Sequence, residues 1–253
     1  MRRRFFQTYK NSGGNLTLIS LEDNNEIYLN LNSSFIIGEI EMKVSGDSKW
    51  VPNSEVILNK GDFIEYRGTI SNLHTADRIG TFMISKKVNL YGDCTSILKD
   101  RMLFNCSLAH LFESTPVVNI HSAFLPTTKL AEMCYYHMFY NCTSLITAPE
   151  LPATTLAHYC YSSMFEGCTS LTTAPELPAT TLAESCYSYM FGKCSNLNYI
   201  KMLATDISVS YCLNNWVYNV SSTGTFVKNP AMTSLPTGTS GIPSGWTVVD
   251  DGE

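Results

Sequence analysis

The chain has 253 residues, of which 44% are hydrophobic and 15% are charged, and its 22 acidic side chains outnumber its 17 lysines and arginines to give a net charge of −5. A net negative charge disfavours non-specific binding to nucleic acid, whose phosphates are held by clustered Lys and Arg. No apolar run approaches the roughly 18 residues that indicate a membrane-spanning helix, so we predict no membrane insertion.

The first residues, MRRRFFQTYKNSGG, predict a flexible tail over residues 1–14. Three arginines precede Phe5 and Phe6, but no apolar stretch of the length found in secretory signals follows them. We therefore expect no export signal, and a protein that resides in the cytoplasm or in a phage or prophage particle. The extracellular surface is the alternative location.

Residues 15–88 show a hydrophobic period of two, which is typical of half-buried strands. Turn residues such as Asn24-Asn25 and Lys60-Gly61-Asp62 separate the apolar segments. The strand candidates are residues 16–19, 26–29, 35–43, 56–58, 63–66 and 81–83. Strands at this spacing predict a small all-β sandwich-like domain that ends near Asn89.

Residues 89–228 are dominated by a repeat of 26 residues. The cysteines that mark its units are Cys134, Cys160, Cys186 and Cys212. A second set follows eight residues later in each unit, at Cys142, Cys168 and Cys194. A fixed period of this length indicates units that bury their apolar faces by stacking on each other.

Each unit combines a helical pattern with an extended one. Six apolar side chains recur at helical spacing, and Gly167 lies where a helix would end. They are Ala157, Cys160, Tyr161, Met164, Phe165 and Cys168. Residues 171–174 are threonine-rich and precede Pro175, which favours a brief strand. The sequence thus predicts an α/β solenoid of strand-turn-helix units, whose segments 145–148 and 171–174 pair in a parallel sheet.

The pattern from Leu151-Pro152 through Cys160-Tyr161 and Met164-Phe165 to Leu171 resembles the BspA-like leucine-rich repeats of gut Bacteroidetes and their phages and prophages. The resemblance covers roughly residues 125–216. This chain departs from the family in its 26-residue unit and in having Met where the family has Ala. The resemblance implies a leucine-rich-repeat coil and a role in surface recognition. A small β-domain ahead of the repeats also resembles phage-encoded members.

Degenerate units are expected at both ends of the array, because terminal units cover an otherwise exposed core edge. Upstream, residues 107–112 echo residues 134–139 with a spacing that is one residue longer. Downstream, Cys212 and Trp216 occupy slots of a fourth unit, and residues 223–228 predict a closing strand. Residues 229–253 are rich in Gly, Pro, Ser and Thr and predict an extended tail, with an edge strand at residues 246–249.

The nine cysteines are predicted to be buried and reduced, with a metal or disulfide role as the minor alternative. No C-x-x-C pair indicates a zinc site. His110 and His137 share one slot of the repeat, but Ser163 and Tyr189 occupy it in the following units, so we predict no metal site. Phosphate loops, nucleophile elbows and metalloprotease motifs are missing from the sequence, and we expect neither a cofactor nor enzymatic activity.

Comparison of the units separates constant core slots from variable slots, which we expect to face solvent. The candidate ligand-contact residues are Thr147, Glu150, Thr173, Glu176, Tyr199, His137 and Tyr189. Their hydroxyl and aromatic groups suit stacking and neutral hydrogen bonds with a glycan or a protein. Glu150 and Glu176 could imitate the carboxylate pair of a glycosidase, but repetition explains them better.

The sequence therefore predicts a non-enzymatic recognition or adhesion module that binds a cell-surface glycan or protein through its repeat surface, as a component of a phage or prophage particle. The alternative is a structural or assembly protein. In that case the repeats would act as a rigid spacer or a self-association surface, and the partners would be other particle or assembly proteins.

Overall fold

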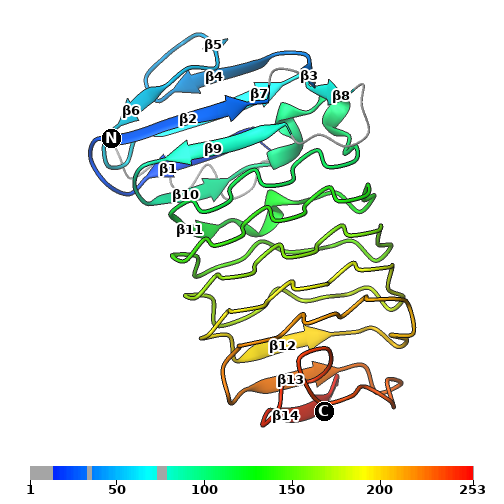
Figure 1. Cartoon of the computed structure of the whole chain (residues 1–253). Coiled ribbons are helices and arrows are strands. Elements are labelled where there is room, and N and C mark those ends of the chain that lie inside the picture. The colour runs from blue at the N-terminus through cyan, green and yellow to red at the C-terminus, as the bar shows by residue number, and fades with distance from the viewer. Residues whose placement is uncertain (1–13, 33–35, 73–78, 253) are drawn as a thin grey trace.

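The computed structural model describes residues 14–32, 36–72 and 79–252. These residues form a β-sheet domain at one end of the molecule and a stack of flat coils, here called rungs, that extends from it (Figure 1). The predicted tail at residues 1–14 lies, apart from Gly14, outside the described residues.

The N-terminal domain is built from short strands, and five of the six predicted strand segments are confirmed; the predicted segment 35–43 is instead divided into two strands at Gly38-Glu39, and its first residue lies outside the described residues. The strands are β1 (Leu16–Ser20), β2 (Asn25–Leu31), β3 (Ile36–Ile37), β4 (Ile40–Val44), β5 (Val51–Pro52), β6 (Val56–Leu58), β7 (Phe63–Gly68), β8 (Ser71–Asn72), β9 (Gly80–Ile84) and β10 (Val88–Tyr91). Successive side chains of a strand point to opposite faces, so buried and more exposed residues alternate along β2. This alternation is the reason for the hydrophobic period of two in its sequence.

Two main sheets share one core in this domain. One has the order β11-β10-β1-β7-β4-β5, in which β11 (Val117–Ile120) comes from the repeat region, and the other has the order β6-β2-β9. A separate pair joins β3 to β8. Tyr66 of the first sheet meets Phe82 of the second edge-on, with ring centroids 5.0 Å apart. This packing is compatible with the predicted β-sandwich.

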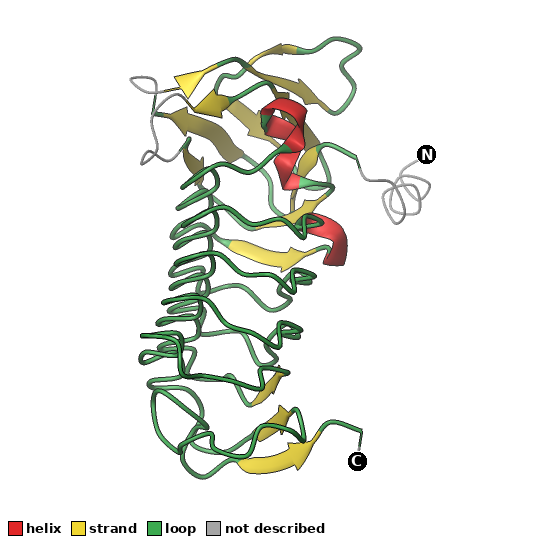
Figure 2. Cartoon of the chain, turned by 90° about the vertical axis from the view of Figure 1, so that its right-hand side faces the viewer, coloured by secondary structure: helices red, strands yellow, loops and turns green. Residues whose placement is uncertain are grey.

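The repeat region contains no α-helix among its described residues, and the predicted leucine-rich-repeat solenoid of strand-turn-helix units is wrong. Helical turns in this region are limited to the 3₁₀ segments η2 (Cys94–Ile97), η3 (Lys99–Arg101) and η4 (Ser122–Phe124), the last of which lies beside the upper rungs in Figure 2. Segments 145–148 and 171–174, expected to pair, share no backbone hydrogen bond in the described structure. Nor does any described helix have the length and apolar composition needed to cross a bilayer.

Residues 159–167 show why no helix forms. Tyr159, Ser163 and Gly167 have φ angles of 53°, 51° and 78°, so every fourth residue is in the left-handed region. A right-handed helix requires negative φ at every position. Between these residues the amides close tight turns, as where Ser162 N donates to Tyr159 O at 3.1 Å. We call this segment a turn run.

The remaining amides of a turn run donate to the next rung. Ser163 N donates to Ser188 O at 2.8 Å, and Phe165 N donates to Met190 O at 3.0 Å. Along a turn run, one amide therefore closes a turn and the next amide bonds to the following rung. The same pattern of left-handed residues recurs in the turn runs 106–114, 133–141, 185–193 and 211–219.

The apolar spacing of a turn run also fits a helix, which explains the wrong prediction. The pairs Cys160-Tyr161 and Met164-Phe165 and the following Cys168 are buried as expected, whereas Ala157 is half-buried. Their true period is four. A period of four departs from a helical turn by only about 40°, so over two turns the side chains still fall on one helical face.

A ladder of stacked phenylalanine rings runs through the core of both regions. Its ring centroids are 4.9 Å apart at the first step and 5.6, 5.7 and 5.8 Å apart at the next three. The rings belong to Phe82, Phe112, Phe139, Phe165 and Phe191. Because Phe82 lies in β9, the hydrophobic core continues from the sheet domain into the rungs.

The C-terminal end of the stack is a parallel sheet of β12 (Tyr199–Met202), β13 (Thr225–Lys228) and β14 (Thr247–Asp250). Residues 229–252 fold over the last turn run. There Val217 N donates to Thr239 O at 3.2 Å, and Trp216 Nε1 donates to Gly241 O at 2.8 Å. This segment covers the core edge that the last rung would otherwise expose.

We predict that Ser163→Gly leaves the free energy of unfolding unchanged or raises it by up to about 1 kcal/mol. Glycine relieves the strain of a positive φ, and this gain offsets the extra entropy of the unfolded chain. Ser162→Gly should lower the free energy of unfolding by about 1–2 kcal/mol. Glycine has no advantage at the negative φ of Ser162, and the hydrogen bond from Ser162 Oγ to Ser188 O is lost. Urea denaturation followed by circular dichroism measures both. Equal losses of about 1 kcal/mol would instead indicate a helix.

Candidate functional site

The seven predicted contact residues lie on two separate parts of each rung. Thr147, Thr173 and Tyr199 lie where successive rungs form β-bridges, which we call the strand side. Glu150 and Glu176 follow this side along the chain. His137 and Tyr189 belong to the turn runs, at equivalent left-handed positions. The structure therefore does not unite the seven residues in one site.

Several variable slots of the turn runs are buried, contrary to the expectation that they face solvent. Ser162, Ser163, Glu166, Ser185 and Ser188 are each at most 7% exposed. Rungs joined by backbone hydrogen bonds lie only about 4.8 Å apart. The serine side chains are therefore shielded by the rungs on either side, whereas Glu166 is enclosed by its hydrogen-bond partners Lys193 and Tyr218.

A column of uncharged polar side chains crosses the strand side, one from each rung. Bridges and strand pairs align its members across neighbouring rungs, and the 26-residue repeat places Thr147 and Thr173 in the same slot. The members of this polar column are Asn89, Asn119, Thr147, Thr173, Tyr199, Thr225 and Thr247. Thr147 Oγ1 donates to Asn119 Oδ1 at 3.0 Å, and Asn119 Nδ2 donates to Asn89 Oδ1 at 3.1 Å.

Glu150 and Glu176 line an open hollow of about 450 Å³ that begins at Ala148, the residue after Thr147. The remaining walls come from Leu151 and from prolines of two successive rungs, namely Pro149, Pro152, Pro175 and Pro178. Glu176 lies 3.4 Å from Lys201 Nζ. Glu150 has no hydrogen bond or ion pair within the described residues, so its carboxylate is available to a ligand.

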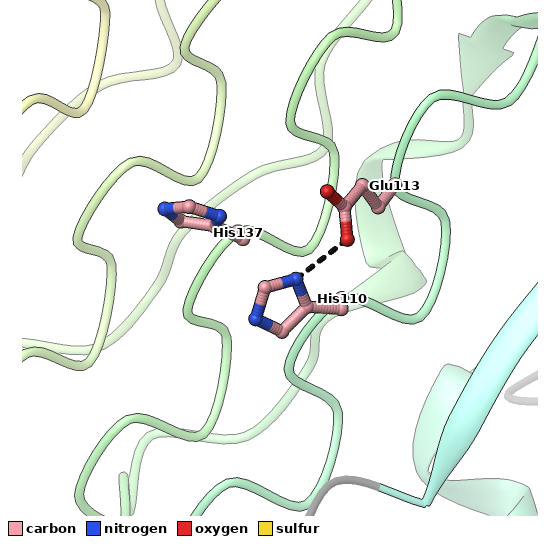
Figure 3. A group of neighbouring side chains, drawn as sticks. All are labelled: His110, Glu113 and His137. Atoms are coloured by element: carbon pink, nitrogen blue, oxygen red, sulfur yellow. Dashed lines mark hydrogen bonds and ion pairs between the residues drawn. The ribbon is translucent and has the colours of Figure 1, made fainter.

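The turn runs bring together three groups that the sequence analysis did not combine. His110 Nδ1 lies 2.6 Å from Glu113 Oε2, and the ring centroids of His110 and His137 are 4.8 Å apart (Figure 3). Glu113 was missed because the first unit is one residue longer than the others. Aligned with an offset of 27, Glu113 occupies the slot of Tyr140, three residues after the histidine slot.

His137 is held between two tyrosine rings of its own turn run. Its ring centroid is 4.1 Å from that of Tyr136 and 4.6 Å from that of Tyr140, and both pairs are stacked. Burial, and to a smaller extent the neighbouring His110, lower the pKa of His137 from 6.5 to about 4. At neutral pH the His137 imidazole is therefore uncharged.

Tyr189 is anchored by structural contacts in its turn run. Its hydroxyl accepts a hydrogen bond from Asn215 Nδ2 at 3.3 Å, and its ring meets that of Tyr218 edge-on at 5.7 Å. The buried Glu166 carboxylate accepts from Lys193 Nζ at 3.0 Å and from the Tyr218 hydroxyl at 2.5 Å. Hydrogen bonds with Tyr218 and with Glu166 raise the pKa of Lys193. Tyr189 thus contributes to the connections between rungs.

The predicted burial of all nine cysteines is confirmed, and their thiols are free in the structure. The second cysteine of each unit also donates a hydrogen bond to a phenylalanine carbonyl one rung back. Cys142 Sγ is 3.0 Å from Phe112 O, and Cys194 Sγ is 3.0 Å from Phe165 O. Burial raises the pKa of both thiols to about 12. These cysteines are therefore structural groups and not nucleophiles.

Comparison of the chain with protein-family models, with curated proteins and with solved structures finds no match. The resemblance to BspA-like leucine-rich repeats gains no support from these comparisons, and the turn runs contradict the fold that it implied. A functional proposal has to rest on the geometry of the rungs.

We expect the native protein to show almost no reaction with a thiol reagent at pH 8, because burial keeps the cysteines protonated and inaccessible. All nine should react after denaturation in guanidinium chloride. Thr172→Cys, at an exposed position, serves as the positive control and should add one rapidly reacting thiol. Rapid labelling of several thiols in the native wild-type chain would contradict the burial.

We predict that the ring protons of His137 titrate with a midpoint near pH 4 in NMR spectra. Since the unfolded chain binds this proton near pH 6.5, stability should be complete above that pH and decline as the pH falls from 6.5 towards 4. His110→Asn should move the midpoint upward, because a second positive charge no longer opposes protonation. A midpoint at 6.5 in the folded wild type is the contrary result.

Proposed function

We propose that this protein is a non-enzymatic recognition module that binds a cell-surface glycan through the polar column and the adjoining hollow. The observation that carries the proposal is the polar column itself. It presents hydroxyl and amide groups in register on successive rungs, without a charged member. An extended polymer with recurring hydroxyl groups could contact several of these rungs at once.

The groups around Thr173 match the chemistry of a sugar. Threonine hydroxyls both donate and accept hydrogen bonds, as sugar hydroxyls do. Tyr199, on the next rung, adds an aromatic ring with a polar end, a combination common in binding surfaces. The prolines of the hollow offer apolar C–H surface beside these polar groups. The strand side thus combines neutral hydrogen bonding with apolar contact.

Glu150 provides the strongest single acceptor on this surface. Its carboxylate is exposed and has no partner among the described residues, whereas Glu176 is paired with Lys201. A hydrogen bond to an ionised acceptor is roughly twice as strong as one between neutral groups. We therefore assign Glu150 to the binding of a sugar hydroxyl that lies in the hollow.

One observation favours the structural or assembly role as a second candidate. β14 is the outermost strand of its sheet, and its Val248 side chain is 43% exposed. The free edge of such a strand offers unpaired backbone groups to another chain. Other particle or assembly proteins could join the stack there, with the rungs as a rigid spacer.

The proposed setting is a phage or prophage particle or the bacterial cytoplasm, with the extracellular surface as the alternative. This part of the proposal is supported by the sequence resemblance alone. It can be tested by fractionating cells of the source bacterium or by analysing purified particles.

Screening the full-length chain on a glycan array, followed by calorimetry, tests the binding role. We expect saturable binding that weakens about tenfold or more in Glu150→Gln, because a charge-assisted hydrogen bond is lost. Thr173→Val, which keeps the shape of the side chain but removes the hydroxyl, should weaken it less. Tyr211→Asn is the matched control on the side of the rungs that the turn runs form, which we call the turn side. Tyr211 is 68% exposed, and Asn tolerates its positive φ.

Three results would oppose the proposal. If the chain binds no glycan but light scattering shows a defined assembly, the structural role replaces recognition. If Tyr211→Asn abolishes binding while Glu150→Gln does not, the ligand lies on the turn side. Release of sugar products from a bound glycan would show that the protein is an enzyme.

A further inference from the structure

We infer that His110, Glu113 and His137 form a binding site for a divalent transition-metal ion of the zinc type. The three side chains come from two successive turn runs and lie next to one another on the turn side, where His110 contacts Glu113 and His137 lies beside them (Figure 3). The site is separate from the polar column, and the inference does not depend on glycan binding.

The distances suit a metal ion after small side-chain movements. One potential ligand atom from each residue lies within 4.8 Å of the other two. Zinc bonds to nitrogen and oxygen of about 2.0–2.2 Å bring ligand atoms of a tetrahedral site to roughly 3.3 Å from each other. The His110 and Glu113 ligand atoms are 2.6 Å apart, so they would separate slightly around an ion, and a small rotation of the His137 side chain would bring its nitrogen to the same ion.

The backbone holds the three residues in place. His110 N donates to Tyr136 O at 2.9 Å across the rungs, and Glu113 N donates to His110 O at 3.2 Å within its turn run. The His137 ring stacks on Tyr136 and Tyr140, and these contacts limit its side chain to small rotations. A site built on such rigid elements loses little conformational entropy when an ion binds.

His137 supplies the independent indication of a ligand. Its ring is half-buried, yet neither ring nitrogen has a hydrogen-bond partner within the described residues. A ring nitrogen without a protein partner keeps its lone pair available to an ion. The same slot holds Ser163, Tyr189 and Asn215 in the later turn runs, so the pair of histidines occurs once in the repeats. A neutral imidazole with an unused nitrogen is the form that binds metal.

The set of donors selects the class of ion. Two imidazole nitrogens and one carboxylate suit Zn²⁺ and neighbouring transition metals, whereas Mg²⁺ and Ca²⁺ prefer oxygen ligands. The His110 and Glu113 side chains are 22% and 29% exposed, so a bound ion would keep a position open to solvent. A water molecule or a donor group of a binding partner would complete its coordination.

Titration calorimetry of the untagged full chain, freed of metal with a chelator, tests the site. We expect one equivalent of Zn²⁺ to bind and Mg²⁺ not to bind. His110→Asn, His137→Asn and Glu113→Gln should each weaken Zn²⁺ binding at least about tenfold. Removal of a group that only supports a metal ligand already weakens binding by about this factor, so loss of a ligand should cost no less. Asn is chosen because Asn215 occupies the same left-handed slot, so the turn should be preserved.

His158→Asn is the matched control. His158 Nδ1 lies 3.3 Å from Glu132 Oε1 and its Nε2 lies 3.9 Å from Glu184 Oε1, so this residue forms another histidine–carboxylate group on the rungs. Zn²⁺ affinity should be unchanged in this variant. NMR shifts of the His110 and His137 rings during zinc titration of the wild type give a readout that needs no variant. Absence of binding, binding unaltered in His110→Asn and His137→Asn, or unshifted His110 and His137 rings would overturn the inference.

Discussion

The hydrogen bonds between successive turn runs determine the rest of this structure. Each run before the last directs every second amide at the next rung, as Ser163 N does towards Ser188 O at 2.8 Å. It can do so only because every fourth residue adopts a left-handed conformation, at a cost of roughly 1–2 kcal/mol for a residue other than glycine. The bonds within and between runs satisfy backbone groups that would otherwise be buried without partners, and this offsets the local strain.

The close spacing of the rungs dictates which side chains the core accepts. Phe165 stacks between Phe139 and Phe191 with nearly parallel rings, a geometry that requires equal offsets along the stack. The slot of Cys168 needs a small apolar group that can also donate to a carbonyl one rung back, at 3.2 Å, and cysteine meets both needs. The constancy of these slots thus follows from the backbone pairing and does not require chemistry at the thiols.

The two sides of the rungs provide different chemistry on the same scaffold. On the strand side, repetition aligns neutral polar groups such as Thr173 and Tyr199, and beside them Glu150 has no hydrogen-bond or ion-pair partner among the residues that the structure describes. On the turn side, repetition has the opposite role, because the histidine cluster exists only where a degenerate first unit places Glu113 beside His110. Extended recognition and a local ion site can therefore coexist. The first uses slots that recur from rung to rung, and the second uses a position where the repeat is irregular.

The sequence alone determined the N-terminal strands, the 26-residue repeat, the burial of the cysteines and the slots that Thr147 and Thr173 share. These depend on short-range alternation and on fixed intervals, which can be read directly from the chain. The conformation of the turn runs was decided by tertiary structure. Residues 159–168 satisfy both a helical period and a period of four, and left-handed residues as different as Tyr159 and Ser163 carry no common signal. Only pairing with the next rung favours the turns over the helix. The approach of His137 to Glu113 follows from that pairing, because a contact between rungs depends on the register that their backbone hydrogen bonds impose.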